Sequence, residues 1–416
     1  MLLLCHRIPY PPDKGDKIRA YHLLQYLCEH YSVHLGTFID DENDLQYRSH
    51  VEAMCDSCKF IEINPLLRRL FSVTALIGKQ PLSNRFYFSY ALQRWVNAVL
   101  GRSDAIPIVL YSSTVAQFVM KSSQNSEGSK IIDFVDIDSD KWRQFAQRKR
   151  WPMSWIYNRE YKSLQAFEFK ACEWADTSYF VSQREAEDFS SLVPDANVHR
   201  VDYYSNGVDR KYFQQSEQHA NPFELEEECK PIVFTGAMDY WPNADAVDWF
   251  VKNVMRKLRE IDPAYSFYIV GSKPGKAVLK LQAQPGVVVT GRVPDVRPYL
   301  QYAHAVVAPM RIARGVQNKV LEAMSMQKPV VLTEMALEGI NASDKEQVLI
   351  ANEVEQYIEC IVGLDAERSE QLGRQARMVI ERDFDWNSNL SKLHKKLLVE
   401  QESMSEEHSS DQVVSQ

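Results

Sequence analysis

Residues Ala308 to Leu332 read APMRIARGVQNKVLEAMSMQKPVVL, and this stretch decides the predicted fold. It begins at the end of an apolar run that is typical of a buried strand, and a loop with two arginines and a glycine follows. A helix is expected from Asn318 to Met326 and a second strand from Pro329 to Leu332. Strand, loop, helix and strand in this order form a right-handed crossover unit of a parallel sheet.

The loop and the start of the helix predict an anion site. Open α/β sheets bind ligands at the carboxyl ends of their strands, and a helix N-terminus offers N–H groups that suit a phosphate. Arg311, Arg314 and Lys319 add positive charge there, while Glu322 suits hydrogen bonds from sugar hydroxyls. The stretch therefore predicts a ligand with a diphosphate and a ribose. The alternative is a surface loop with solvated charges.

The composition excludes several classes of protein. The 416 residues are enough for two domains of ordinary size. A formal net charge of −8 argues against nucleic acid as the main partner. No apolar run reaches the roughly 18 residues of a membrane span. The seven scattered cysteines include one Cys-x-x-Cys, Cys55 and Cys58, without a second pair for zinc, so free thiols in a reducing cytoplasm are expected.

Alternating strand and helix patterns predict two doubly wound parallel sheets. We expect an N-terminal Rossmann-like domain over residues 1–213, a polar, acidic linker over 214–230 and a second α/β domain over 231–382. Residues 383–400 are expected to form a helix. The Ser-, Glu- and Gln-rich residues 401–416 are expected to be a disordered tail.

Glycines at strand ends mark further candidate contacts, because they let a ligand approach the backbone closely. In the second domain, Gly236 and Gly271 each follow an expected strand, and a third loop carries Arg292 and Val293. In the first domain, Gly15 precedes an expected helix, and turn chemistry is its alternative explanation. The basic residues around Gly15 are further candidates for a phosphate contact; they are Lys14, Lys17 and Arg19.

Two stretches of the first domain carry clustered charge. Residues Asp133 to Asp140 place four carboxylates just past a strand, so Asp136 and Asp138 are candidates for contacts with an acceptor or a donor sugar. Helix capping and solvation are the alternative. Residues 141–161, KWRQFAQRKRWPMSWIYNREY, interleave basic and aromatic side chains, which favour an anionic membrane interface. A core-facing helix with a basic solvent side is the other interpretation.

Together these features resemble the family 4 glycosyltransferases, retaining enzymes of the GT-B fold. Two Rossmann-like domains of that fold face a cleft, and the last helix crosses back onto the first domain. Glu322-Ala323-Met324 and Pro329-Val330-Val331 match the family's donor-binding segment, and Asn206-Gly207-Val208-Asp209 resembles the turn that ends its first domain. The variant RGVQNKVLEAM is similar to a bacterial subgroup associated with exosortase and exopolysaccharide loci.

The resemblance implies roles for single residues. Glu322 inherits the glutamate that contacts the nucleotide ribose. Arg314 stands where the family has a glutamate for the donor sugar, and Gln317 replaces a usual glycine. The loop GAMDYWPNADAV lacks the family's basic pair for phosphate, so Arg311, Arg314 and Lys319 are expected to supply that charge. The predicted catalytic residues are Arg314, Lys319, Asp136 and Asp138. The predicted nucleotide-sugar contacts are Gly15, Gly236, Gly271, Arg292, Val293, Arg311, Gly315, Gln317, Asn318, Val320 and Glu322.

The implied activity is a hexosyl-type transfer from a nucleotide-diphosphate sugar to a glycan or lipid-linked acceptor, with retention and without a metal or other cofactor. Exopolysaccharide or cell-envelope polysaccharide synthesis is the expected role. The expected location is the cytoplasm, and an interfacial patch at 141–161 would place the protein peripherally on the inner membrane. Two alternatives are a non-catalytic scaffold of polysaccharide assembly and a nucleotide-sugar epimerase of the same fold.

Overall fold

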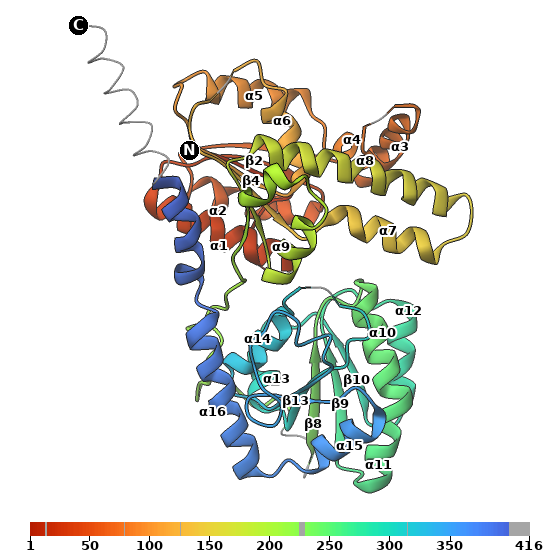
Figure 1. The fold of residues 1–416 in the computed structure, drawn as a ribbon. Coiled ribbons are helices and arrows are strands. Elements are labelled where there is room, and N and C mark those ends of the chain that lie inside the picture. The colour runs from red at the N-terminus through yellow and green to blue at the C-terminus, as the bar shows by residue number, and fades with distance from the viewer. Residues whose placement is uncertain (13–14, 79, 125, 224–228, 314, 399–416) are drawn as a thin grey trace, which may run out of the picture. The chain divides into compact units, whose positions relative to one another are not determined.

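The computed structural model describes residues 1–12, 15–78, 80–124, 126–223, 229–313 and 315–398. The chain divides into two compact units (Figure 1). The first unit consists of Met1–Tyr204 and the chain from Asn387 onward, and the second consists of Ser205–Trp386. The boundary expected after residue 213 therefore lies earlier, between Tyr204 and Ser205. The expected disordered tail, 401–416, lies outside the described residues.

The first unit is built on a seven-stranded parallel sheet in the order β3-β2-β1-β4-β5-β6-β7. Its strands are β1 (Leu2–Cys5), β2 (His34–Ile39), β3 (Ser57–Glu62), β4 (Ile108–Tyr111), β5 (Lys130–Val135), β6 (Thr177–Phe180) and β7 (Val201–Tyr203). The central strands β1 and β4 are buried along their whole length, as their apolar sequences require. A strand was expected at His199–Val201, but Pro194 fixes the backbone at the start of a 3-10 helix, η4 (Asp195–Arg200), and β7 begins only after it.

Helices cover both faces of this sheet (Figure 1). They are α1 (Gly15–His30), α2 (Arg48–Glu52), α3 (Pro65–Ser72), α4 (Leu82–Phe86), α5 (Tyr90–Leu100), α6 (Ala116–Met120), α7 (Asp138–Arg148), α8 (Met153–Trp174) and α9 (Gln183–Ser190), with the 3-10 helices η1 (Glu42–Tyr47), η2 (Val73–Ile77) and η3 (Ser113–Val115). Helices α7 and α8 form a hairpin that extends away from the sheet (Figure 1).

A buried ion pair ties α1 to the sheet. The Arg19 guanidinium donates to both carboxylate oxygens of Asp133 on β5, at 2.7 and 3.1 Å, and stacks 3.6 Å from the ring centre of Tyr204. Lys17 is likewise buried and lies 2.6 Å from Asp44. Both residues were expected near a phosphate. That prediction is wrong, because each side chain points into the unit and already holds a carboxylate.

The second unit is built on a six-stranded parallel sheet in the order β10-β9-β8-β11-β12-β13. Its strands are β8 (Lys230–Thr235), β9 (Tyr265–Val270), β10 (Val287–Gly291), β11 (Ala305–Ala308), β12 (Val330–Leu332) and β13 (Leu349–Ile350). Its helices are α10 (Trp241–Phe250), the π-helix η5 (Val251–Met255), α11 (Arg256–Ile261), α12 (Lys276–Leu279), the 3-10 helix η6 (Lys280–Ala283), α13 (Arg297–Gln301), α14 (Asn318–Ser325), α15 (Val354–Val362) and α16 (Ala366–Asp383). The strand order is that of a doubly wound fold, as predicted.

The last described helix, residues 386–398, returns to the first unit, as expected. His394 accepts from or donates to the Tyr31 hydroxyl at 3.3 Å, and the Tyr179 hydroxyl donates to the carbonyl of Lys392 at 3.4 Å. Leu390 and Leu393 are fully buried. Within the described ranges, no helix combines the length and apolar character needed to cross a bilayer.

Candidate functional site

The strand order of the second unit selects one edge of its sheet as the candidate site. Successive strands run outward from β8 through β9 to β10, and the chain then returns to place β11 on the other side of β8. Open α/β sheets bind ligands at the carboxyl ends of the strands where the order reverses. The loops after Thr235 and Ala308, followed by α14, lie at this point.

Glycines allow the loops at this edge to pack backbone against backbone. A Cβ added to Gly271 would lie 1.7 Å from the carbonyl oxygen of Gly236. The Gly236 N–H donates to Val270 at 3.0 Å, and the Gly271 N–H donates to Gly291 at 3.1 Å. The structure thus brings together the two glycines predicted from strand ends, with their backbones in direct contact.

Lys319 reaches from α14 to the loop after β8. Its Nζ donates to Asn243 Oδ1 at 2.7 Å and lies 3.8 Å from the sulfur of Met310. Asn243, which is buried in α10, also donates to the carbonyl of Ala237 at 2.9 Å and so fixes the loop that carries Gly236. Burial lowers the pKa of Lys319 to about 8, although Glu322 opposes the shift. In the described part of the chain Lys319 has no carboxylate within ion-pair distance, an arrangement suited to an incoming anion.

The N-terminus of α14 faces the same edge. Its cap residue, Gln317, makes no side-chain capping bond and donates instead to the carbonyl of Gly315 at 3.1 Å. Asn318 is held in place by Asn206, whose amide donates to its Oδ1 at 3.1 Å. Val320, which belongs to α14 itself, is fully buried. The helix start is therefore positioned by its neighbours, and among the described residues its cap position adds no side-chain bond to the positive dipole end.

Glu322 lies one turn further along α14. Burial raises the pKa of its carboxyl to about 7, and the charge of Lys319 opposes this. Its carboxylate forms no hydrogen bond or ion pair with the residues that the structure describes. Glu322 thus presents acceptor oxygens that no described residue engages, and such oxygens suit hydrogen bonds from sugar hydroxyls.

The other residues predicted to contact the nucleotide sugar differ in whether they already bind another side chain. Arg311 is held by Asp245 through two hydrogen bonds of 2.6 and 3.0 Å. Asp245 therefore already neutralises the charge expected to serve a phosphate. Arg292 is exposed and Val293 is half-buried in the loop after β10. Arg314 lies outside the described residues.

Asp136 and Asp138, at the carboxyl edge of the first unit's sheet, share one cation. Each carboxylate lies 3.0 Å from the Nζ of Lys141. Burial disfavours the charged lysine, but the two carboxylates outweigh this and raise the pKa of Lys141 well above its ordinary value. Asp138 is also the first residue of α7. The helix-capping interpretation and the sugar-contact interpretation therefore both concern this residue. Gly15 is the exposed first residue of α1.

Sequence reasoning missed Arg7, which belongs to a polar group directly after the first strand. Arg7 follows β1 and binds Asp16 at 2.6 Å and Asp40 at 2.7 Å. His6 stacks on Tyr111 with ring centres 5.8 Å apart, and its Nδ1 is buried without a hydrogen-bond partner among the described residues. Burial lowers the pKa of His6, Arg7 adds to this, and Asp16 and Asp138 oppose it. From the sequence, His6 is a candidate acid or base only for the epimerase alternative, and the position of Arg7 directly after the first strand was the signal that could have revealed Arg7.

Within the described ranges, no group of three His, Cys, Asp or Glu side chains is arranged to hold a metal ion. The two units thus present different chemistry at their sheet edges. The second offers a desolvated cation, glycine loops and a helix start. The first offers carboxylates paired with Lys141 and Arg7.

Comparison with known proteins gives a family match within the second unit and structural matches to the whole chain. Residues 229–366 match the family model "Glycosyl transferases group 1". No curated protein matches the sequence.

Solved structures match nearly the whole chain. HepE from Anabaena, in complex with UDP and glucose, superposes with a TM-score of 0.66 at 12% identity, covering 96% of this chain and 99% of that one. Sucrose-phosphate synthase from Thermosynechococcus elongatus gives 0.70 at 16%, covering 96% and 98%. WaaG, a glycosyltransferase involved in lipopolysaccharide biosynthesis, gives 0.62 at 15%, covering 94% and 98%. The chain therefore has the GT-B fold, and residues 229–366 of its second unit match the glycosyltransferase group 1 model.

Proposed function

We propose that this protein transfers a sugar from a nucleotide-diphosphate sugar to a glycan or lipid-linked acceptor, with retention of configuration. The observation that carries the proposal is Lys319, a half-buried lysine hydrogen-bonded to Asn243 at 2.7 Å, beside two glycine loops and an uncapped helix start. The group 1 match over residues 229–366 and the UDP bound to HepE support the same ligand class.

The chemistry follows from where charge develops. The leaving group is a nucleoside diphosphate, and its negative charge grows in the transition state, so cations and N–H groups already aimed at it lower the barrier. Lys319 and the first N–H groups of α14 are placed for this role, and Glu322 for the ribose. Because these groups can neutralise the diphosphate, we propose that the reaction does not need a metal. For retention, the acceptor attacks from the face that the diphosphate leaves, and a phosphate oxygen takes its proton.

Arg314 belongs to the same proposal. Its planar guanidinium can hold two phosphate oxygens at once. Since Arg311 is held by Asp245, we assign Arg314, the other arginine of this loop, to the diphosphate. A carboxylate on an acidic donor sugar is its other candidate partner. Titration of Arg314→Glu with the bare diphosphate separates the two, because weaker binding supports the phosphate role and unchanged binding supports the sugar role.

The acceptor is assigned to the sheet edge of the first unit. Asp136, Asp138 and Asp16 supply hydroxyl acceptors, and Lys141 and Arg7 offset part of their charge. Such a set suits a polyhydroxylated sugar. Exopolysaccharide or cell-envelope polysaccharide synthesis, in the cytoplasm, is the role that we propose for the transfer.

A panel of nucleotide sugars tests the function. Thermal-shift measurements should find at least one donor that raises the unfolding midpoint, because a ligand selective for the folded state stabilises it. Incubation with that donor should release nucleoside diphosphate slowly without an acceptor and faster with one. A donor that binds but is never cleaved would instead support a scaffold, and a donor converted to an isomer would support an epimerase.

A further inference from the structure

Exposed apolar side chains gather on two segments of the first unit. Eight of the 22 large hydrophobic side chains exposed in the described residues lie within residues 66–73 and 151–155. They are Leu66, Leu67, Leu70, Phe71, Val73, Trp151, Met153 and Trp155. We name residues 66–73 and 148–155 together the α3–tip surface. Scattered exposed leucines need no explanation, but a concentration of this kind marks an interaction site.

Helix α3 presents its apolar side to solvent. Leu66 and Leu70, one helical turn apart, are each 71% exposed. The opposite side of the helix is held to the unit, since Arg68 donates to the carbonyl of Phe88 at 2.7 Å and Ser72 is buried. The helix is well formed, because Asn64 caps its N-terminus through the N–H groups of the first turn. An ordinary surface helix buries its apolar side, whereas α3 turns that side to solvent.

The tip of the α7–α8 hairpin combines aromatic and basic side chains. Trp142 packs against Tyr157 inside the hairpin, with ring centres 5.4 Å apart, whereas Trp151 is 80% exposed. The stretch from residue 145 to 159 contains four basic residues and no Asp or Glu, in a chain of formal net charge −8. The inner side of the hairpin is thus packed as the core-facing interpretation of residues 141–161 expects, and the tip exposes basic and aromatic side chains.

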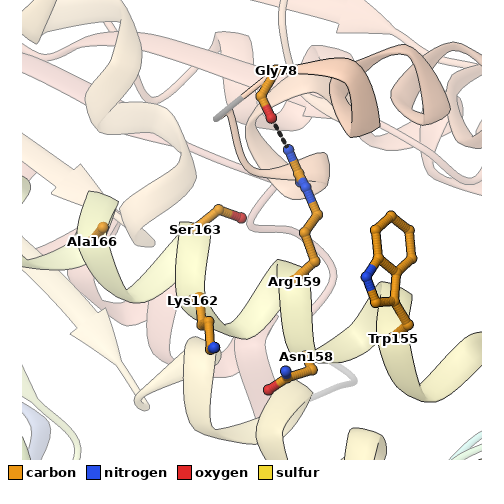
Figure 2. A pocket seen from close by; sticks show the side chains of 7 residues that line it. All are labelled: Gly78, Trp155, Asn158, Arg159, Lys162, Ser163 and Ala166. Carbon is orange, nitrogen blue, oxygen red and sulfur yellow. Dashed lines mark hydrogen bonds between the residues drawn. The ribbon is translucent and has the colours of Figure 1, made fainter.

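An open cavity of about 440 Å³ lies between α8 and the chain that follows α3 (Figure 2). Arg159 reaches from α8 and donates to the carbonyls of Ala75, Gly78 and Gln80 at 2.5 to 2.9 Å, which fastens the chain after α3 to the hairpin. The cavity is lined by Trp155, one turn before Arg159, and by the exposed Lys162, about two turns after Trp155 on the same helix face. Aromatic and cationic side chains of α8 therefore border a cavity next to the chain that follows α3.

We propose that the α3–tip surface binds the headgroup region of an anionic membrane. Leu66 and Leu70 would enter the acyl boundary, as the apolar side of an interfacial helix does. Trp151 and Trp155 would lie at headgroup depth, and the basic residues 148–150 would attract anionic lipids. Exposed leucines beside tryptophans and basic residues form the combination that an anionic bilayer interface binds, and we therefore assign the surface to a bilayer. This binding does not depend on sugar transfer, although it would suit a lipid-linked acceptor.

Vesicle flotation of the full chain tests the proposal. The vesicles are phosphatidylcholine alone or with about 30% phosphatidylglycerol, a content that gives an anionic surface potential. Leu66→Glu/Leu70→Glu places two charges on α3 at exposed positions, where they should leave the fold intact. Ile261→Glu/Met378→Glu is the matched control, because these second-unit side chains are 56% and 59% exposed. UDP binding is measured on every variant.

The wild type and the control should float with anionic vesicles, and the α3 variant should bind at least about tenfold more weakly. Binding should fall in about 0.5 M salt, where the screening length is only a few ångströms. Wild type that stays soluble at low salt, or an α3 variant that floats like the wild type, would overturn the proposal. A wild-type dimer that the α3 variant dissociates would also overturn it, by showing a second copy as the occupant. UDP binding retained in any of these outcomes leaves the sugar-transfer proposal standing.

Discussion

Replacing Lys319 by methionine removes the cation that the candidate site directs at the donor diphosphate. Methionine keeps the length and apolar character of the lysine stem, so the packing over Phe234, whose ring centre lies 5.0 Å from Nζ, is largely preserved. The variant loses only the charge and the bond to Asn243 at 2.7 Å. Lys328→Met is a matched control. Burial also lowers the pKa of Lys328 to about 8. Lys328 lies just before β12 begins, at the opposite edge of the sheet from the candidate site, and its Nζ donates to the backbone carbonyl of Gln301.

The size of the effect follows from one charged hydrogen bond. Such a bond contributes about 1.5–3 kcal/mol, so Lys319→Met should weaken nucleoside diphosphate binding by about 10- to 150-fold. Calorimetric titration measures the dissociation constant directly. Lys328→Met should bind like the wild type.

Proton uptake provides a second, independent readout. Because burial lowers the pKa of Lys319 to about 8, roughly half of its side chains are uncharged at pH 8 before binding. A bound diphosphate favours the charged form and raises this pKa, so binding should take up roughly half a proton at pH 8. Glu322, with a pKa of about 7, is then mostly ionised and contributes little. Titrations in buffers of different ionisation enthalpy measure the uptake. Equal affinity of wild type and Lys319→Met, or proton release by the wild type at pH 8, would refute the assignment.

Three further substitutions test other parts of the structure. Glu322→Ala should weaken nucleoside diphosphate binding by about 1.5–3 kcal/mol if its carboxylate accepts bonds from the ribose, and unchanged calorimetric affinity would reject that role. Gly271→Ala should destabilise the second unit by about 1–3 kcal/mol in urea unfolding, because its Cβ would lie 1.7 Å from a backbone oxygen. Gly275→Ala, with nothing within 4 Å, should be nearly silent, and equal losses would contradict the close packing. Arg19→Met should cost about 3–5 kcal/mol in the same assay, because it leaves Asp133 buried and unpaired; a loss near zero would mean that water reaches the pair.

The order of strands and helices could be predicted because it follows local signals. Apolar runs alternate with helical patterns, and such alternation allows few arrangements besides a parallel sheet. Glycine after β8 and β9 likewise marked loops that pack backbone to backbone. Lys319 and Glu322 were predicted because their spacing places both near the start of one helix.

Partners far apart in the sequence could not be predicted. Nothing near Arg311 indicates that it binds Asp245, 66 residues earlier, and nothing in the loop after β8 singles out Asn243 as the partner of Lys319. Arg19 was misassigned for the same reason: its helix turns it toward Asp133, 114 residues away.

The leucines of α3 illustrate a different limit. A spacing of four residues, as between Leu66 and Leu70, is typical of a helix that buries its apolar side. Only the tertiary contacts of Arg68 and Ser72 reveal that the helix is attached by its other side.

The central claim is that the second unit binds a nucleoside diphosphate at the edge formed by β8, β11 and α14. Calorimetric titration of the wild-type chain with UDP, GDP and ADP in turn, in the presence of a chelator, tests it most directly. We predict saturable binding of at least one of them to a single site, with at least about tenfold weaker binding of the corresponding monophosphate. No saturable binding of any diphosphate, or equal binding of the monophosphate, would contradict the assignment.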